Sequence, residues 1–317
     1  NYTTITYSSG TLTINSVGLV ITANSVGPVI YGDSTPANGY SVTGLNSATT
    51  AISVSYTYQG TGSTIYGPSA SAPSEVGTYR ITPSATFTQG SASLYASVTY
   101  ISSGYQISKA TATVTPANIT VVFNDAAPAS YSFNLSNLKF SETTSNIAGY
   151  VAPTCTSNYS KGRNVLDTAA TITCTGGSAN NYLFDTSATG TVTITPKPLT
   201  ISGSTVVSRS YNGTKTAGAI NEGTLVGLVS GQNLVVTGVG SDYSSASPGT
   251  YITTVTYTLS NGAGGTASNY SISTEVLNGT ITSASTTFAI SLSYGVETVY
   301  SNNISTQGNS VRISTTT

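Results

Sequence analysis

The stretch GTVTITPKPLTIS, residues 190–202, contains two short runs in which apolar and hydroxyl residues alternate, joined by a pair of prolines. Alternation with a period of two is the pattern of a β-strand with one buried face. Pro196 and Pro198 fix φ in the range of extended chain, so the second run follows the first with little freedom. The stretch therefore predicts the end of one β-sheet unit and the start of the next.

Similar stretches occur at three further places: GTLTINSVGLVI at residues 10–21, YQISKATATV at 105–114 and GTITSASTTF at 279–288. Aligned on one isoleucine each, the four stretches are 93, 87 and 87 residues apart, at Ile14, Ile107, Ile194 and Ile281. Solenoid repeats have periods of roughly 20–50 residues, so this period is too long for one. It matches the length of a whole small β-sandwich.

We therefore predict an all-β fold of tandem Ig-like β-sandwich domains with partial domains at both ends. The complete units are the first repeat, residues 15–107, the second repeat, 108–194, and the third repeat, 195–281. Residues 1–14 are expected to be the closing strands of an incomplete unit, and residues 282–317 the opening strands of another. We expect the units to follow one another with short linkers and little contact between them.

Other landmarks recur in step with this period. An aromatic residue followed by a turn signal comes early in each period, at Tyr31, Phe123, Tyr211 and Tyr300. Gly, Asn or Asp after the aromatic tolerates the left-handed backbone of a tight turn. A tyrosine in an alternating run comes late in each repeat, at Tyr95, Tyr182 and Tyr270.

The composition is unusual for its low charge. Charged residues make up 6% of the 317 residues, against about 25% in ordinary soluble proteins. The net charge is −1 and the basic residues are scattered, so no patch exists that could bind nucleic acid. No apolar run approaches the roughly 20 residues of a membrane-spanning helix. We expect a secreted or cell-surface protein with a surface suited to packing against copies of itself.

The sequence offers little to an enzyme or a metal site. Without histidine the common catalytic triads and most zinc sites are impossible. Asp33 and Asp125 follow the aromatic turns, and Glu75, Glu222 and Glu275 lie in polar stretches, so we expect turn capping and solvation from them. We predict that the chain is not an enzyme and has no catalytic residue, cofactor or metal ligand.

Two cysteines, Cys155 and Cys174, lie in strand-like runs with the turn signal Lys161-Gly162 between them. This arrangement suits a cross-strand disulfide within the second repeat. Such a bridge would indicate an oxidising, extracellular setting. Two buried free thiols are the alternative.

The chain resembles the bacterial Ig-like modules known as MBG and YDG domains. The resemblance rests on VIYGDSTP from Val29, YNGTK from Tyr211 and the linker ITPKPLTIS from Ile194. The second repeat departs from the pattern, with FNDAAP from Phe123 where the family has Tyr-Gly-Asp. The resemblance implies MBG-like first and second repeats, a YDG-like third repeat, and a long secreted surface protein with a structural or adhesive role.

Two functions from different classes fit these features. One is the structural subunit of an extracellular or cell-surface fibre, sheath or surface layer, whose partner is a second copy of the chain. The other is the stalk or binding region of a large repetitive adhesin, whose partners are cell-surface glycans or neighbouring cells.

The sequence of residues 1–14 aligns without a gap with residues 181–194, and Phe288 and the residues after it alternate as a buried strand should. The C-terminal segment of one copy could therefore pair with the N-terminal strands of the next, in a head-to-tail contact that extends into a filament. The residues expected in this contact are Tyr2, Ile5, Leu12, Ile14, Phe288, Ile290, Leu292, Tyr294 and Val296. The alternative is that these residues are a window of a longer chain, whose missing strands lie in the same molecule.

Overall fold

The computed structural model describes residues 6, 8–11, 15–35 and 37–284. They fall into two compact units. Unit 1 contains the residues up to Ala117, with Ser130–Ser157 and Ile172–Gly190. Unit 2 contains Asn118–Ala129, Asn158–Thr171 and the residues from Thr191 onward.

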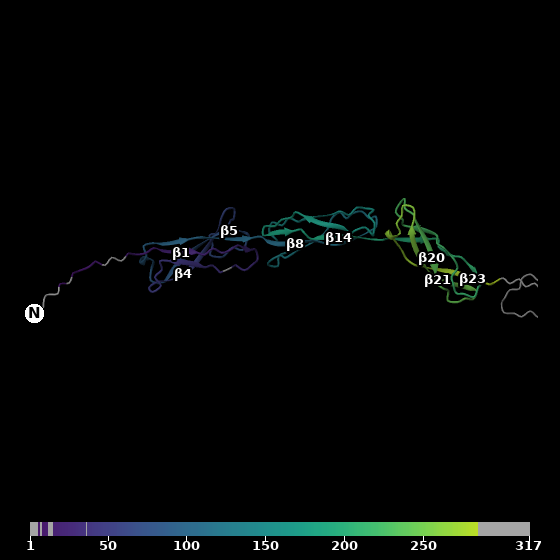
Figure 1. The fold of residues 1–317 in the computed structure, drawn as a ribbon, viewed down its shortest axis with the longest axis horizontal. Coiled ribbons are helices and arrows are strands. Elements are labelled where there is room, and N and C mark those ends of the chain that lie inside the picture. The colour runs from purple at the N-terminus through teal and green to yellow at the C-terminus, as the bar shows by residue number, and fades with distance from the viewer. Residues whose placement is uncertain (1–5, 7, 12–14, 36, 285–317) are drawn as a thin grey trace, which may run out of the picture. The chain divides into compact units, whose positions relative to one another are not determined.

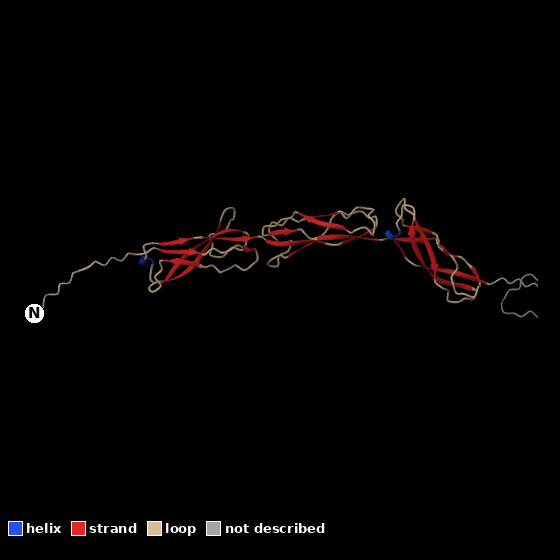
Figure 2. Cartoon of the chain, in the orientation of Figure 1, coloured by secondary structure: helices blue, strands red, loops and turns tan. Residues whose placement is uncertain are grey.

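Strands and loops make up nearly all of the described residues (Figure 2). The helical segments among them are two single 3-10 turns, Ala92–Leu94 and Ala267–Asn269. The prediction of an all-β fold of the Ig-like sandwich class is confirmed. The division into three domains at residues 107 and 194 stays a prediction.

The first seven strands belong to unit 1: β1 Leu19–Ala23, β2 Val29–Ile30, β3 Tyr40–Thr43, β4 Ala51–Gly60, β5 Gly77–Gln89, β6 Val98–Ile101 and β7 Ser103–Ser108. They form a three-stranded sheet in the order β3-β1-β6 and a four-stranded sheet in the order β2-β7-β5-β4. The long hairpin of β4 and β5 is prominent in Figure 1. Strand β1 contacts β5, and Ala23 and Ile81 belong to one buried cluster, so the two sheets enclose a common core.

Alternating sequence places alternating side chains in the core. In β1 the buried residues are Leu19, Ile21 and Ala23, and the residues between them are half-buried. This is the period of two that a strand with one buried face requires.

Unit 1 also contains the sheet β10-β8-β13, from strands β8 Ala110–Pro116, β10 Phe133–Ser136 and β13 Tyr182–Asp185. Strand β11 Thr154–Ser157 pairs antiparallel with β12 Ala170–Thr175 in unit 1, and β9 Ile119–Val122 pairs in parallel with β14 Thr189–Thr195 in unit 2.

Unit 2 contains nine strands between residues 197 and 282: β15 Lys197–Ser202, β16 Thr205–Val206, β17 Arg209–Ser210, β18 Ile220–Asn221, β19 Thr224–Val226, β20 Leu234–Gly240, β21 Gly249–Asn261, β22 Tyr270–Ile272 and β23 Glu275–Thr282. They form the sheets β19-β15-β22, β16-β18 and β17-β23-β21-β20. Figure 1 shows β20, β21 and β23 side by side in green and yellow.

The pairings repeat along the chain. The opening strand of each predicted repeat pairs in parallel with the strand near its late tyrosine, as β1 with β6, β8 with β13 and β15 with β22. Strands β5 and β21 both begin with Gly-Thr-Tyr and both have 13 residues. The sequence repeats are thus structural equivalents.

The predicted linkers run directly from one strand into the next. Only Lys109 separates β7 from β8, and only Pro196 separates β14 from β15. These short connections bring the aromatic turn of one repeat to the late tyrosine of the next.

Candidate functional site

The aromatic turns are held by one backbone hydrogen bond that recurs three times. The N–H of Tyr31 donates to the carbonyl of Ser108, that of Phe123 to Thr195, and that of Tyr211 to Thr282, each at 2.8 Å. The three acceptors are 87 residues apart. Each aromatic therefore lies beside the end of its own repeat's closing strand.

In two cases the late tyrosine of the following repeat packs on this aromatic. The rings of Tyr31 and Tyr182 meet edge to face, with centroids 5.5 Å apart. Phe123 and Tyr270 meet in the same way at 5.4 Å. Tyr31 and Phe123 are 4% and 2% exposed, whereas Tyr211 is 46% exposed.

An asparagine precedes each of these tyrosines and reaches back to the preceding repeat. Asn181 accepts the N–H of Val76 through Oδ1 at 3.2 Å and donates Nδ2–H to a carboxylate oxygen of Glu75 at 2.5 Å. Burying an amide costs free energy unless the amide is hydrogen-bonded. Asn181 is 5% exposed, and both its side-chain oxygen and its NH2 group are hydrogen-bonded.

The second asparagine repeats this arrangement. Asn269 is 1% exposed. It accepts the N–H of Val165 at 2.8 Å and donates to the Oδ1 of Asn164 at 2.7 Å.

We call the residues Tyr31, Glu75, Val76, Glu142, Asn181 and Tyr182 the first junction. Their equivalents Phe123, Asn164, Val165, Gln232, Asn269 and Tyr270 form the second junction. All residues of the first junction lie in unit 1, and all residues of the second lie in unit 2.

The tyrosine hydroxyls of both junctions also have equivalent partners. The hydroxyl of Tyr182 accepts the N–H of Lys139 at 2.7 Å and donates to Oε2 of Glu142, three residues later. The hydroxyl of Tyr270 accepts the N–H of Val229 at 3.1 Å and donates to Oε1 of Gln232, again three residues later.

Glu142 has a second donor from the preceding repeat. The hydroxyl of Tyr31 donates to its Oε1 at 2.9 Å, so each carboxylate oxygen accepts one phenol. Hydrogen bonds to an ionised acceptor are stronger than those between neutral groups.

The loop before Glu142 has an uncommon backbone. Asn137, Phe140 and Ser141 have φ values of 63°, 51° and 59°, in the left-handed region that non-glycine residues rarely adopt. Such conformations are retained where the surroundings hold them, and they cluster at functional positions. Two side-chain contacts fix this loop: the ring of Phe140 meets Tyr31 edge to face at 5.5 Å, and Lys139 forms a 3.1 Å ion pair with Asp33.

Burial and the carboxylate together perturb the two phenols. Desolvation first, and then the hydrogen bond to Glu142, raises the pKa of Tyr31 to about 12. The same two causes, in the same order, raise the pKa of Tyr182 to about 12. Both hydroxyls are therefore neutral donors at all physiological pH values.

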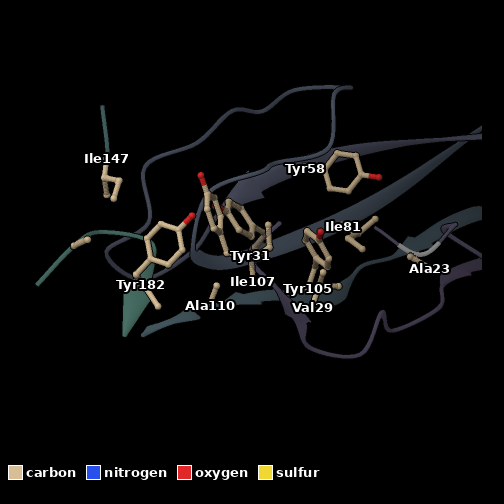
Figure 3. Packing of buried hydrophobic residues seen from close by; sticks show 13 residues of the cluster. Ala23, Val29, Tyr31, Tyr58, Ile81, Tyr105, Ile107, Ala110, Ile147 and Tyr182 are labelled. Atoms are coloured by element: carbon tan, nitrogen blue, oxygen red, sulfur yellow. The ribbon is translucent and has the colours of Figure 1, made fainter. Parts of the chain in front are cut away.

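The first junction is continuous with an apolar cluster. Figure 3 shows Tyr182 beside Tyr31, with Ile147 on the side of Tyr182 away from Tyr31 and Ile107 in the same cluster. These side chains come from both sides of the predicted boundary at residue 107. The prediction of little contact between consecutive repeats is therefore wrong at this boundary, because the linker is too short to separate the two faces.

The disulfide joins Cys155 and Cys174 across β11 and β12, where the two residues are directly opposite each other. Cys174 is buried in the second repeat. The bridge predicted from the sequence is present.

A shallow groove of about 790 Å³ lies within unit 1 beside the first junction. Polar side chains line it together with apolar ones, among them Tyr66, Glu75, Gln106, Lys109 and Leu183. Its aromatic and hydrogen-bonding groups are of the kind that contact polar ligands.

The residues predicted for a subunit contact, namely Tyr2, Ile5, Leu12, Ile14, Phe288, Ile290, Leu292, Tyr294 and Val296, all lie outside the described residues. Within the described part of the chain, no three His, Cys, Asp or Glu residues are placed to hold a metal ion. That part also contains no helix with the length and apolar character to cross a membrane.

Sequence reasoning identified the aromatic turns and the late tyrosines but not their contact. Glu142 was missed because it lies in an irregular loop with no periodic signal. Glu75 was expected to be merely solvated, whereas it accepts a hydrogen bond from Asn181. The Asn-Tyr dipeptide at 181–182 and 269–270 was the available signal.

The chain has an all-β, Ig-like fold in which one set of contacts between successive repeats occurs twice with equivalent residues. Residues 195–277 match the YDG domain family, in agreement with the YDG-like prediction for the third repeat. No curated protein sequence matches the chain significantly.

Solved structures similar to this chain include the I9–I11 tandem of titin and the EC1–4 domains of Drosophila N-cadherin. The titin tandem is 14% identical, with 81% of this chain and 96% of that chain covered and a TM-score of 0.24. The cadherin fragment is 9% identical, with 86% and 75% covered and a TM-score of 0.24.

Proposed function

We propose that this chain is a structural subunit of an extracellular or cell-surface fibre, sheath or surface layer, and that copies of it assemble head to tail. The observation that carries the proposal is the recurrence of one junction at two successive boundaries, built from equivalent residues. A protein that joins its modules by a repeated, buried contact is suited to serial extension.

The chemistry of the chain supports a structural role and a setting outside the cell. The buried polar groups of both junctions bond to each other, so they hold neighbouring repeats together and need no substrate. The disulfide favours an oxidising compartment. In this proposal the chain is not an enzyme, needs no cofactor, and belongs with MBG-like and YDG-like modules of large secreted proteins.

For the contact between copies we propose strand complementation. The C-terminal segment with Phe288 and Tyr294 would pair with the N-terminal strands around Leu12 and Ile14 of the next copy. Backbone hydrogen bonds would supply the affinity, and alternate side chains would supply the core. Such a head-to-tail contact does not close on itself and so generates a filament.

A stalk or binding region of an adhesin is the second candidate. The groove beside the first junction favours it, because Tyr66, Gln106 and Lys109 could contact a cell-surface glycan. Glycan-array binding that is lost on Tyr66→Ala would support this candidate.

Electron microscopy of the native material, combined with intact mass spectrometry, tests the main proposal. We expect ordered filaments or sheets, an intact mass that shows no covalent bond between copies, and loss of assembly when residues 1–14 are deleted. Isolated rods, or assembly by the shortened chain, would contradict it.

A further inference from the structure

We propose that the positions of Tyr31 and Glu142 in the first junction, and of Phe123 and Gln232 in the second, are selectivity elements that determine which repeat can follow which. The proposal rests on the serial architecture put forward above but not on self-assembly. Tyr31 and Phe123 occupy one equivalent position, as their backbone hydrogen bonds show. Glu142 and Gln232 occupy another, three residues after the N–H that the late tyrosine accepts.

At the first junction, the number of donors equals the number of acceptor oxygens. Tyr31 and Tyr182 each donate one hydroxyl, and the carboxylate of Glu142 offers one oxygen to each. An ionised carboxylate only accepts hydrogen bonds, so two phenols suit it.

At the second junction, both sides of the pair change together. Phe123 brings no hydroxyl, and the side chain opposite Tyr270 is an amide with one oxygen and one NH2 group. That single oxygen, Oε1 of Gln232, accepts the single hydroxyl of Tyr270.

Exchanging the partners would break this match. Tyr31 facing a glutamine would meet an NH2 donor where Glu142 presents its Oε1 acceptor, so its hydroxyl would have to accept there or share the one carbonyl oxygen with Tyr182. Phe123 facing a glutamate would leave one carboxylate oxygen without its donor in a partly buried place. Leaving a buried polar group unpaired costs more free energy than an intact hydrogen bond contributes to stability. The face around Tyr31 therefore fits a repeat whose front carries an Asn-Tyr pair and a glutamate.

Two ends of repeats face no other described repeat: the end of the third repeat near Pro248 and the end of the first repeat near Leu94. Each of these ends lacks residues that the two junctions use. Pro248 precedes β21 as Val76 precedes β5, and a proline has no N–H for an asparagine to accept. At the front of the first repeat, Leu94 replaces the asparagine before the late tyrosine and is 54% exposed. The complete junction is thus assigned to the two inner boundaries, and a second copy must attach by other contacts.

A double-mutant cycle in the full chain tests the proposal. The variants are Tyr31→Phe, Glu142→Gln and the double variant. The double variant gives the first junction the phenylalanine and glutamine that the second junction has at the equivalent positions. The measurement is amide hydrogen exchange of Val76, divided by that of Val165 in the same molecule, so that a global loss of stability cancels. Each single substitution is expected to raise this ratio about fivefold, and the double variant to return it to within about twofold of the parent.

The converse cycle gives an independent check. Gln232→Glu is expected to speed exchange at Val165, and adding Phe123→Tyr is expected to slow it again. Single substitutions without effect, or a double variant whose change equals the product of the singles, would overturn the proposal. The cycles use dispersed chains. If the two substitutions are coupled but the chains do not assemble, only the fibre proposal is rejected. If the chains assemble but the two substitutions are not coupled, only the selectivity proposal is rejected.

Discussion

Tyr31 and Tyr182 meet edge to face at 5.5 Å although they are the landmarks of two successive sequence repeats. The equivalent pair, Phe123 and Tyr270, has nearly the same geometry at 5.4 Å. Edge-to-face aromatic pairs add about 0.5–1.5 kcal/mol beyond the area that they bury. The recurrence of this contact makes the boundary between repeats a packed element of the fold.

Asn181→Ala should loosen the first junction. The variant leaves the N–H of Val76 and the carboxylate of Glu75 without their partner, so we expect a loss of about 1–3 kcal/mol in the free energy of unfolding. Chemical denaturation measures it. Asn180, the exposed neighbour of Asn181, supplies the matched control. If Asn180→Ala lowered the free energy of unfolding equally, the role given to Asn181 in the first junction would be contradicted.

The disulfide should stabilise the second repeat. Its cysteines are 19 residues apart in sequence, and closing a loop of this size contributes about 3 kcal/mol in the chain-entropy model. Cys155→Ala combined with Cys174→Ala should lower the free energy of unfolding by this amount. Quantitative labelling of both thiols in the unreduced native protein would show that the bridge is not formed.

Alkaline pH should destabilise the chain through its buried phenols. The pKa of Tyr31 and that of Tyr182 are raised to about 12, above the ordinary value near 10. Between these values the unfolded chain has released the two protons and the folded chain still binds them, so stability is full below pH 10 and falls as the pH rises toward 12.

Denaturant unfolding between pH 9 and 12, followed alongside tyrosine absorbance, checks this expectation. The double variant Tyr31→Phe with Tyr182→Phe should show a smaller decline over that interval. An unchanged decline would mean that other groups cause it.

Gly32→Ala should cost more than Gly213→Ala. Both glycines have positive φ, 84° and 78°, so both substitutions bring a similar backbone strain of about 1–2 kcal/mol. At Gly32 a Cβ would also lie 2.3 Å from Cγ of Lys139, whereas at Gly213 it would meet nothing within 4 Å. The additional loss at Gly32, measured by thermal unfolding, reports the packing of Lys139 on the turn. Equal losses would indicate that this packing contributes nothing.

The sequence predicted the parts of the fold that depend on local pattern. Alternation located the strands, and the period of 87 residues located equivalent positions such as Ser108 and Thr195. The two cysteines in strand-like runs predicted their bridge. None of these signals depends on a contact between side chains of different repeats.

The junctions could not be predicted because their contacts cross between repeats. Nothing in the pattern around Tyr31 indicates that its hydroxyl meets a carboxylate 111 residues later. Glu142 lies in a loop whose backbone departs from the regular structures, so no periodicity marks it. The Asn-Tyr pairs could be found as a repeated dipeptide, but their role depends on the short linkers that bring two faces together.

At both junctions an asparagine of one repeat bonds to the backbone of the repeat before it. Amide hydrogen exchange at Val76 and Val165 in the unaltered full chain tests this most directly, since both N–H groups lie outside the strands and donate to asparagine side chains. We expect both amides to be protected to the level of neighbouring strand residues. Exchange at the rate of an unstructured peptide at either position would contradict the claim.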